Sequence, residues 1–403
     1  MTFRRDSLLI YGAAFLRSTA LGMAAVILGL YAAERNAGPG EIGLLIGAGL
    51  AGNALATFLA SFRADLFGRK KSLLIFAFLS TAGALAFTLS EKFSFLLGAA
   101  FLGMLNGMGR DRGPCTSLEQ AILPATAAPE KRTLAFAFYN GALDLGHASG
   151  GLLALFPAFL RRRGMEQLTS YQGGFFLYAA LLAGSFLLYL GLSGAIELRV
   201  GPDLKPGRLS PESRKIITRL SGLFAIDSLG SGFLNSALLS YWFMMRFGAR
   251  EEIIGPVFFA ARAANMFSHF AAAWLSKKIG SINTMVFTHI PSSIFLMIVP
   301  LAPSLPVAIL LYFLRECLVE MDVPVRQSYV MAVVKEEERT MASGITHLVR
   351  LAGWAVSPPL AGAIMKFLAL SSPLYMGAGL KIAYDLALFR LFRHHKPPEE
   401  KYP

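Results

Sequence analysis

Long apolar segments follow one another along almost the whole chain, and short polar links separate them. A helix needs about 20 apolar residues to cross a bilayer. Lipid offers no hydrogen-bond partners to an exposed backbone, so helices that satisfy their own backbone groups are favoured. The sequence therefore predicts an all-α polytopic membrane protein with twelve transmembrane helices. The predicted spans are 8–32, 42–62, 72–90, 93–123, 133–160, 170–196, 220–246, 253–276, 283–301, 304–334, 340–368 and 372–392.

The charged residues are few, and their placement predicts an orientation. They make up 16% of the 403 residues, whereas a soluble globular chain averages about 25%. The net charge of +13 is spread over the short links, which indicates topology signals and argues against nucleic-acid binding. Most basic links lie on the side that holds both termini, so we expect both termini in the cytoplasm and the protein in the cell (inner or plasma) membrane. The run Arg161-Arg162-Arg163 falls on the opposite side, against this rule.

Two halves of the chain match each other as a repeat. A polar stretch with Pro202, Pro206 and Pro211 separates them, so we predict an N-terminal six-helix lobe (1–196), a cytoplasmic linker (197–219) and a C-terminal six-helix lobe (220–403). Several residues of the first half pair with residues of the second, with a two-residue insertion before Asn53 and the Glu119 pair further on. These pairs are Arg17 with Asp227, Gly22 with Gly232, Tyr31 with Tyr241, Asn53 with Asn265, Gly68 with Gly280 and Glu119 with Arg326.

The link between the second and third spans carries a specific pattern. It reads Ser-Phe-Arg-Ala-Asp-Leu-Phe-Gly-Arg-Lys-Lys, in which Gly68 allows a sharp turn. An acid contributes nothing to a basic topology signal, but it is favoured at a helix N-terminus. The link resembles the loop 2–3 signature of the major facilitator superfamily, which it matches at Ala64, Asp65, Gly68, Arg69 and Lys70.

This resemblance implies two pseudo-symmetric six-helix bundles and a midplane substrate site between them. We expect Asp65, Gly68, Arg69 and Lys70 to form a cytoplasmic gate, with Asp65 facing the helix that begins near Thr340.

Ionisable residues inside the spans are costly and usually face a cavity or a partner. On helical spacing they form stripes that fit the walls of a polar cavity. The candidate cavity residues are Arg17, Arg112, Glu119, Asn140, Asp144, His147, Asp227, Asp322, Arg326, His347 and Arg350.

The roles of these charges stay open. Arg17 and Asp227 are opposite in sign at matched positions, so they either pair across the lobes or each pair within their own lobe. Asp144 is a candidate proton carrier, and His147 and His347 are either proton-handling or polar packing residues. Lys381 and Asp385, four residues apart on the last span, are expected to pair with each other.

These features predict a secondary active transporter that works by alternating access, with proton-coupled export of an organic or amphiphilic compound. The alternative is uptake or exchange of an anionic metabolite, which the arginines favour. The sequence has no P-loop, His-Glu-x-x-His or Gly-x-Ser-x-Gly pattern, so we expect no enzyme activity, cofactor or metal. The expected partners are a small-molecule substrate, protons and lipid, with the protein as a monomer. A membrane enzyme and a non-transporting receptor on the same fold are the remaining alternatives.

Overall fold

The computed structural model describes residues 2–110, 112–123, 132–197, 209–335 and 338–393, and every regular element in these ranges is a helix. The chain divides into two compact units. Unit 1 comprises Met1–Pro202 and Asn235–Phe259, and unit 2 comprises Asp203–Leu234 and Ala260–Pro403. The predicted lobe limits stay a prediction.

The helices of unit 1 are α1 (Thr2–Glu34), α2 (Pro39–Phe67), α3 (Arg69–Leu89), α4 (Phe93–Gly103), α5 (Pro114–Ile122), α6 (Arg132–Leu153), α7 (Phe156–Arg162), α8 (Gln167–Leu190), η3 (Gly194–Ile196) and α10 (Ser236–Phe247). Those of unit 2 are α9 (Pro211–Phe233), α12 (Ser281–Ile298), η4 (Val299–Leu301), α13 (Leu305–Val319), α14 (Asp322–Ala332), α15 (Arg339–Phe367) and α16 (Ser372–Phe392). The boundary at residue 259 falls inside α11 (Glu251–Ile279).

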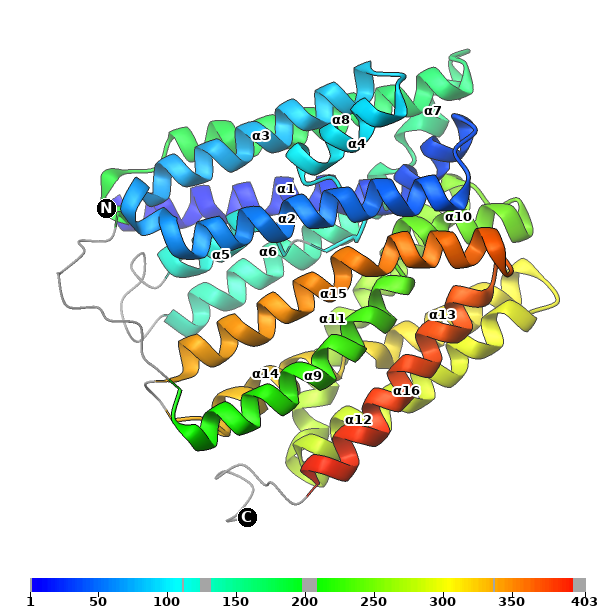
Figure 1. The fold of residues 1–403 in the computed structure, drawn as a ribbon. Helices are drawn as coiled ribbons and strands as arrows, with labels where there is room; N and C mark the ends of the chain where they lie inside the picture. Colours follow the sequence, from blue (N-terminus) through cyan, green and yellow to red (C-terminus); the bar gives the residue numbers. More distant parts are fainter. Residues whose placement is uncertain (1, 111, 124–131, 198–208, 336–337, 394–403) are drawn as a thin grey trace. The chain divides into compact units, whose positions relative to one another are not determined.

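The predicted all-α membrane fold is confirmed, because each of the twelve spans coincides with one helix or with two consecutive helices. Within the described ranges, eight helical stretches are both long and apolar enough to cross a membrane. Five predicted spans are not continuous helices: 93–123 is α4 and α5, 133–160 is α6 and α7, 170–196 is α8 and η3, 220–246 is α9 and α10, and 304–334 is α13 and α14. Figure 1 shows α4 and α5 as two separate helices.

In unit 1 the most buried helix is α1, which packs against α6, α8 and α10. Glycines on α6 allow its close approach to α1. A Cβ atom on Gly150 would lie 2.2 Å from the carbonyl oxygen of Thr19, and one on Gly146 would lie 2.6 Å from that of Phe15. Both distances are far below van der Waals contact, so α6 requires glycine at these positions.

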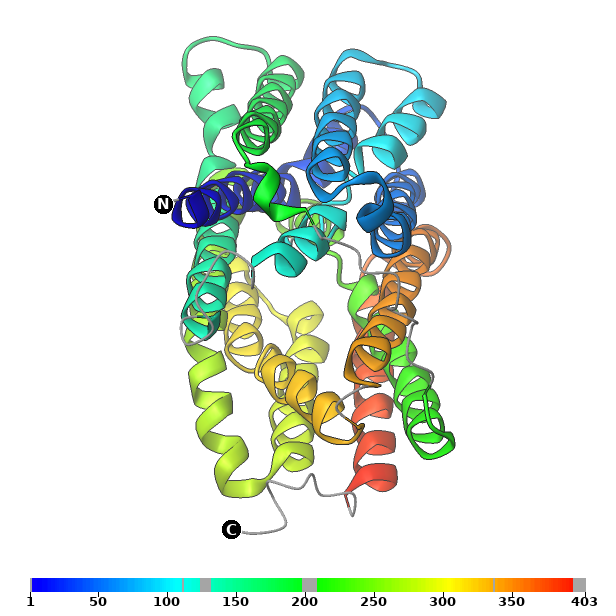
Figure 2. The same cartoon turned by 90° about the vertical axis from the view of Figure 1, so that its left-hand side faces the viewer.

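In unit 2, α9 packs against α15 and α16, and α12 packs against α13, α14 and α16. Figure 2 shows α16 (red) beside α9 (green). The apolar core of this unit includes Phe224, Met285, Tyr329 and Tyr384.

Candidate functional site

The segment between α4 and α5 breaks the fourth predicted span. Met104 ends α4 in the left-handed region, with a φ of 56°, and Gly107 and Gly109 also have positive φ angles. The Asn106 side chain holds the turn, because its Oδ1 accepts from the Met108 backbone N–H at 3.0 Å and its Nδ2 donates to the Met104 carbonyl at 3.0 Å. Pro114 starts the next helix at its first position, where a missing N–H costs nothing.

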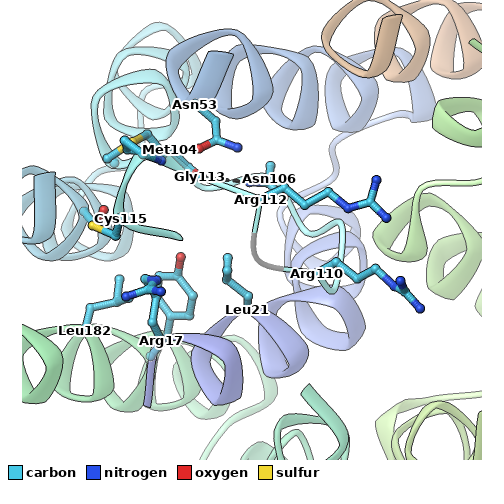
Figure 3. Close-up of a pocket in the computed structure, with 14 residues that line it drawn as sticks. Arg17, Leu21, Asn53, Met104, Asn106, Arg110, Arg112, Gly113, Cys115 and Leu182 are labelled. Carbon is cyan, nitrogen blue, oxygen red and sulfur yellow. Dashed lines mark hydrogen bonds between the residues drawn. The ribbon is translucent and has the colours of Figure 1, made fainter. Parts of the chain in front are cut away.

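An open pocket of about 400 Å³, mouth included, lies beside this break (Figure 3). Non-helical backbone at membrane depth is tolerated where it is buried or lines a cavity. Here the break itself supplies a large part of the wall. The lining residues are Arg17, Leu21, Asn53, Ser80, Gly103, Met104, Asn106, Arg110, Arg112, Gly113, Pro114, Cys115, Tyr178 and Leu182.

The polar part of the pocket wall is rich in donors. The lining residues include three arginines, Arg17, Arg110 and Arg112, and two asparagines, Asn53 and Asn106. In Figure 3, Arg110 and Arg112 extend from the break in the same direction, while Arg17 stands on a different wall. Among the described lining residues none is an acid. The charged residues among the described lining residues are therefore all basic.

Arg17 is held in place by a buried cluster. Its guanidinium bonds Glu119 in bidentate fashion, with N–O distances of 2.5 and 3.1 Å, and also contacts the Tyr189 hydroxyl. Glu119 further accepts from Tyr139 at 2.8 Å and from Tyr189 at 2.6 Å. Glu119 is fully buried and Arg17 is 6% exposed. The two tyrosines were not among the predicted site residues.

Unit 2 has a larger charged cluster around Asp227. This carboxylate contacts three cations, Lys381 at 3.1 Å, Arg350 at 3.0 Å and Arg326 at 3.4 Å. Arg326 also pairs with Asp322, one turn earlier on α14. All four predicted residues of this group, namely Asp227, Asp322, Arg326 and Arg350, therefore lie in one network.

The network continues to a histidine that the sequence interpretation missed. Lys381 Nζ lies 3.1 Å from His289 Nε2, and His289 Nδ1 lies 2.9 and 3.1 Å from the two oxygens of Asp385. The predicted pairing of Lys381 with Asp385 is wrong, because the lysine reaches across to Asp227 on α9 and to His289 on α12. Only the fold brings α12 between these positions, so no spacing in the sequence indicates His289.

Arg17 and Asp227 each have partners of opposite charge within their own unit. The within-lobe alternative therefore accounts for both charges, and a pair between Arg17 and Asp227 is not needed to balance either of them.

The remaining predicted cavity residues lie on α6 and α15. Asn140 is exposed, Asp144 is half-buried and His147 is buried on α6, and none of the three lines the pocket described above. His347 is half-buried on α15, one turn before Arg350. Their assignment to a transport cavity stays a prediction.

The predicted gate sequence forms the junction of α2 and α3. Gly68 has a φ of 99°, a conformation that favours glycine. The Glu197 carboxylate accepts from the backbone N–H groups of Arg69 at 2.6 Å and Lys70 at 3.1 Å, so it caps α3. Lys70 Nζ donates to the carbonyls of Leu190 and Leu192. The side chains of Asp65 and Thr340 lie outside the described residues, and the gate stays a prediction.

Two arginines of the basic run at 161–163 have partners within unit 1. Arg161 pairs with Glu251 and Glu252 at the start of α11, the latter at 2.7 Å. Glu251 also accepts from the Tyr171 hydroxyl at 2.6 Å and is fully buried. Arg163 stacks over Phe159, 4.6 Å from the ring centroid. Arg161 and Arg163 thus have local packing roles, which charge bias alone did not indicate.

The comparisons with known proteins agree with this architecture. The family model described as Major Facilitator Superfamily matches residues 10–321 and 220–403. The uncharacterized membrane protein YJR124C of Saccharomyces cerevisiae is 25% identical over 421 residues, which cover 96% of this chain and 94% of that protein.

Solved transporter structures share the fold. The nucleoside transporter NupG has a TM-score of 0.76 at 13% identity, covering 96% of this chain and 100% of that one. The inward-open xylose transporter XylE of E. coli has a TM-score of 0.71 at 15% identity, and the match covers 96% of this chain and 95% of that one. The human organic anion transporter MFSD10 has a TM-score of 0.63 at 16% identity, and the match covers 96% of this chain and 100% of that one. At these identities the likeness shows the fold alone. Because the family model spans most of the sequence, this chain belongs to the Major Facilitator Superfamily of membrane transporters.

Proposed function

We propose that this protein is a secondary transporter that carries a small organic anion across the membrane by alternating access. The observation that carries the proposal is the lining of the unit 1 pocket, which includes Arg17, Arg110 and Arg112 and, among the described residues, no acid. Guanidinium forms bidentate, charge-assisted hydrogen bonds with carboxylate and phosphate groups. Of the two substrate classes that the sequence leaves open, this wall favours the anionic one over a neutral or amphiphilic compound.

The backbone around the pocket adds to its preference for anions. Gly113 and Pro114, at the beginning of α5, are among the lining residues. The first turn of a helix carries a partial positive charge, from N–H groups without intrahelical partners. The apolar side chains of Leu21, Met104 and Leu182 fit the carbon skeleton of an organic molecule better than an inorganic ion.

Arg17 has a different part from the other two arginines. Its bidentate bond to Glu119 fixes the guanidinium in one orientation. The charge of Arg17 is largely balanced by this bond. We therefore assign Arg17 and Asn53 to orienting the solute and Arg112 to binding its charged group.

The wider proposal follows from the sequence. It comprises coupling to protons, net export, a monomeric protein in the cell membrane with cytoplasmic termini, and transport without catalysis. One structural relative is described as an organic anion transporter, but others are described as nucleoside and xylose transporters. The substrate class therefore rests on the pocket.

Ligand binding to the purified full-length protein tests the proposal. Organic carboxylates, phosphates and sulfonates are screened by thermal unfolding, each beside a neutral amide or alcohol of similar size. A ligand at 100 times its Kd stabilises the folded state by about 2.7 kcal/mol. We expect some of the anions to raise the melting temperature and their neutral partners to leave it unchanged. Labelled forms of the binding anions should then show counterflow in proteoliposomes.

Two variants make the result specific. Arg112→Gln should abolish the shift, because the amide keeps polarity but removes the charge. Arg162→Gln changes an exposed arginine away from the pocket and should retain the shift. Equal stabilisation by a neutral partner, or an unchanged shift in Arg112→Gln, would contradict an anion site. Binding without counterflow would indicate a receptor.

A further inference from the structure

Four ionisable side chains form a continuous hydrogen-bonded chain inside unit 2. The chain runs from Asp227 on α9 through Lys381 on α16 and His289 on α12 to Asp385 on α16. Its three links measure 3.1, 3.1 and 2.9 Å. None of the four residues is more than 3% exposed.

The donors and acceptors of this chain determine the state of the histidine ring. A lysine ammonium group only donates, and Lys381 faces the Asp227 carboxylate, which keeps it charged. His289 Nε2 must therefore accept from Lys381, and the ring proton sits on Nδ1, where it donates to Asp385. In this arrangement His289 is neutral, although it lies against a buried carboxylate.

The two neighbours of His289 act on it in opposite directions. Asp385, 2.9 Å from Nδ1, favours a positively charged ring. Lys381, 3.1 Å from Nε2, opposes it, because an added proton on Nε2 would point at an ammonium group. The protonation of the ring therefore depends on where Lys381 lies, and Asp227, which already accepts from the ammonium group at 3.1 Å, can retain the lysine when its contact with the ring is lost.

We propose that His289 is a proton-binding site, and that its protonation displaces Lys381 from the ring toward Asp227. A proton from a hydronium ion forms an N–H bond at the Nε2 lone pair, and a water molecule is left behind. The Nδ1–H to Asp385 hydrogen bond remains, and the Lys381–His289 hydrogen bond is lost. Lys381 keeps its own three protons throughout.

Other charged groups around His289 balance one another. From α16 come Lys381, Asp385 and the Tyr384 ring, which meets His289 edge-on at 6.1 Å. α9 contributes Asp227, α14 contributes Asp322 and Arg326, and α15 contributes Arg350. On α13, Arg315 and Glu316 pair with each other, and Glu316 accepts from Asn265 on α11. With a neutral ring, the three cations and three carboxylates around Asp227 and Asp385 cancel, so one added proton changes the net charge of the network.

Lys381 links this site to the helices that surround it. When the lysine moves toward Asp227, it competes with Arg350 and Arg326 for the same carboxylate. Arg350 stacks over Trp354, 4.8 Å from the ring centroid, so the rearrangement reaches α15. If the protein is the transporter proposed above, this is a route by which proton binding acts on helix packing. Proton binding itself requires no transported solute.

The test is a pH titration of the full-length protein in lipid vesicles, labelled with ¹⁵N-histidine and followed by solid-state NMR. The His289 signal is identified by its loss in His289→Gln, and His269→Gln, which removes another histidine of unit 2, serves as the control. We expect a neutral ring with its proton on Nδ1 at the alkaline end of the titration and a doubly protonated ring at the acid end. In Lys381→Met, where Arg326 and Arg350 still neutralise Asp227, the change should occur at least about one pH unit higher, which is about 1.4 kcal/mol.

Two results would overturn the proposal. One is a His289 ring that keeps a single protonation state over the whole titration, as a purely structural histidine would. The other is an unchanged titration in Lys381→Met, which would show that the lysine does not control the ring. No solute enters the experiment, so a failure of the anion proposal leaves this result untouched.

Discussion

The two units place an ion pair at the same two repeat positions but with opposite polarity. In unit 1 the first helix supplies the cation, Arg17, and the later helix the anion, Glu119. In unit 2 the first helix supplies the anion, Asp227, and the later helix the cation, Arg326. The two halves therefore share a contact between these repeat positions, but the sign of the charge at each position is reversed.

The surroundings of the two pairs differ more than the pairs themselves. In unit 1 the hydroxyls of Tyr139 and Tyr189 complete the hydrogen bonding of Glu119. In unit 2 the charged side chains of Arg350 and Lys381 complete the hydrogen bonding of Asp227. Among the described residues, Glu119 therefore has one cationic partner, whereas Asp227 has three. The loss of one cation leaves Asp227 paired but leaves Glu119 without a countercharge.

The last helices of the two units show the same contrast. The buried positions of α8 and α16 align so that Gly174 matches Gly377, Tyr178 matches Lys381 and Leu182 matches Asp385. Tyr178 and Leu182 line the pocket of unit 1. Where unit 1 has a pocket wall, unit 2 has the charged chain through His289.

The largest expected effect is the loss of the single cation that faces Glu119 among the described residues. Arg17→Gln should lower the free energy of unfolding by about 3–5 kcal/mol, because it leaves a fully buried carboxylate without a countercharge. Arg350→Gln in unit 2 should cost far less, since Asp227 retains Lys381 and Arg326. Thermal unfolding of both variants measures the difference.

The charge swap provides the control for this comparison. Arg17→Glu combined with Glu119→Arg gives unit 1 the polarity of unit 2 and should recover part of the loss, with a coupling energy of about 0.5–3 kcal/mol. Equal losses in Arg17→Gln and Arg350→Gln, or simple additivity in the swap, would show that the two units hold their charges in the same way.

A smaller effect is expected at the end of unit 1 where residues 235–259 join it. Arg161→Gln should lower the free energy of unfolding by about 1–3 kcal/mol, because Glu251 is fully buried and loses a charged donor. The neighbouring Arg162 is exposed, so Arg162→Gln should change it by less than about 0.5 kcal/mol. Denaturation in matched detergent measures both variants. Equal losses in Arg161→Gln and Arg162→Gln would show that the ion pairs of Arg161 contribute no more to stability than an exposed arginine does.

The smallest effect concerns pH and a helix cap of unit 2. Hydrogen bonds from the Ser213 side chain and the Ser210 backbone hold the pKa of Glu338 below its ordinary value of 4.5. A carboxyl with a lowered pKa stabilises the folded state above its unfolded pKa, and this contribution is lost as the pH falls through the lower, folded value. Wild type should therefore melt a few degrees above Glu338→Gln at neutral pH, and the two curves should converge in acid.

Glu91→Gln, at an exposed glutamate between α3 and α4, is the matched control and should follow wild type at every pH. A difference between Glu338→Gln and wild type that stays constant down to the acid limit would rule out the cap as its source.

The sequence predicts the spans well because hydrophobicity is a local property. It misses the break at 104–113, since a hydropathy average over a whole span passes over Asn106, Gly107 and Gly109. Those residues were the available signal, because asparagine and glycine favour turns. The repeat register correctly matches Arg17 with Asp227 and Glu119 with Arg326, yet it does not say which partners each one has.

Side-chain partners depend on packing that no spacing reveals. Lys381 and Asp385 lie one turn apart, so the sequence pairs them, but the structure places His289 beside both. Neutral hydroxyls such as Tyr139 and Tyr189 do not appear in a search for charges, although they complete the Glu119 site. Neutral residues that donate hydrogen bonds to a buried charge were therefore the hardest to predict.

The contact between Arg161 and Glu251 also has a consequence in time. The two residues are 90 positions apart in the sequence, and a ribosome adds roughly 5–20 residues per second. Arg161 therefore enters the membrane on the order of 5–20 s before Glu251 is synthesised. During that interval the Ser170 hydroxyl, nine positions later and 3.3 Å away in the finished structure, is a partner already within the nascent chain. A chain that stops before residue 251 has neither Glu251 nor Glu252, so the ion pairs of Arg161 with these two residues can form only after the second half of the chain begins to be made.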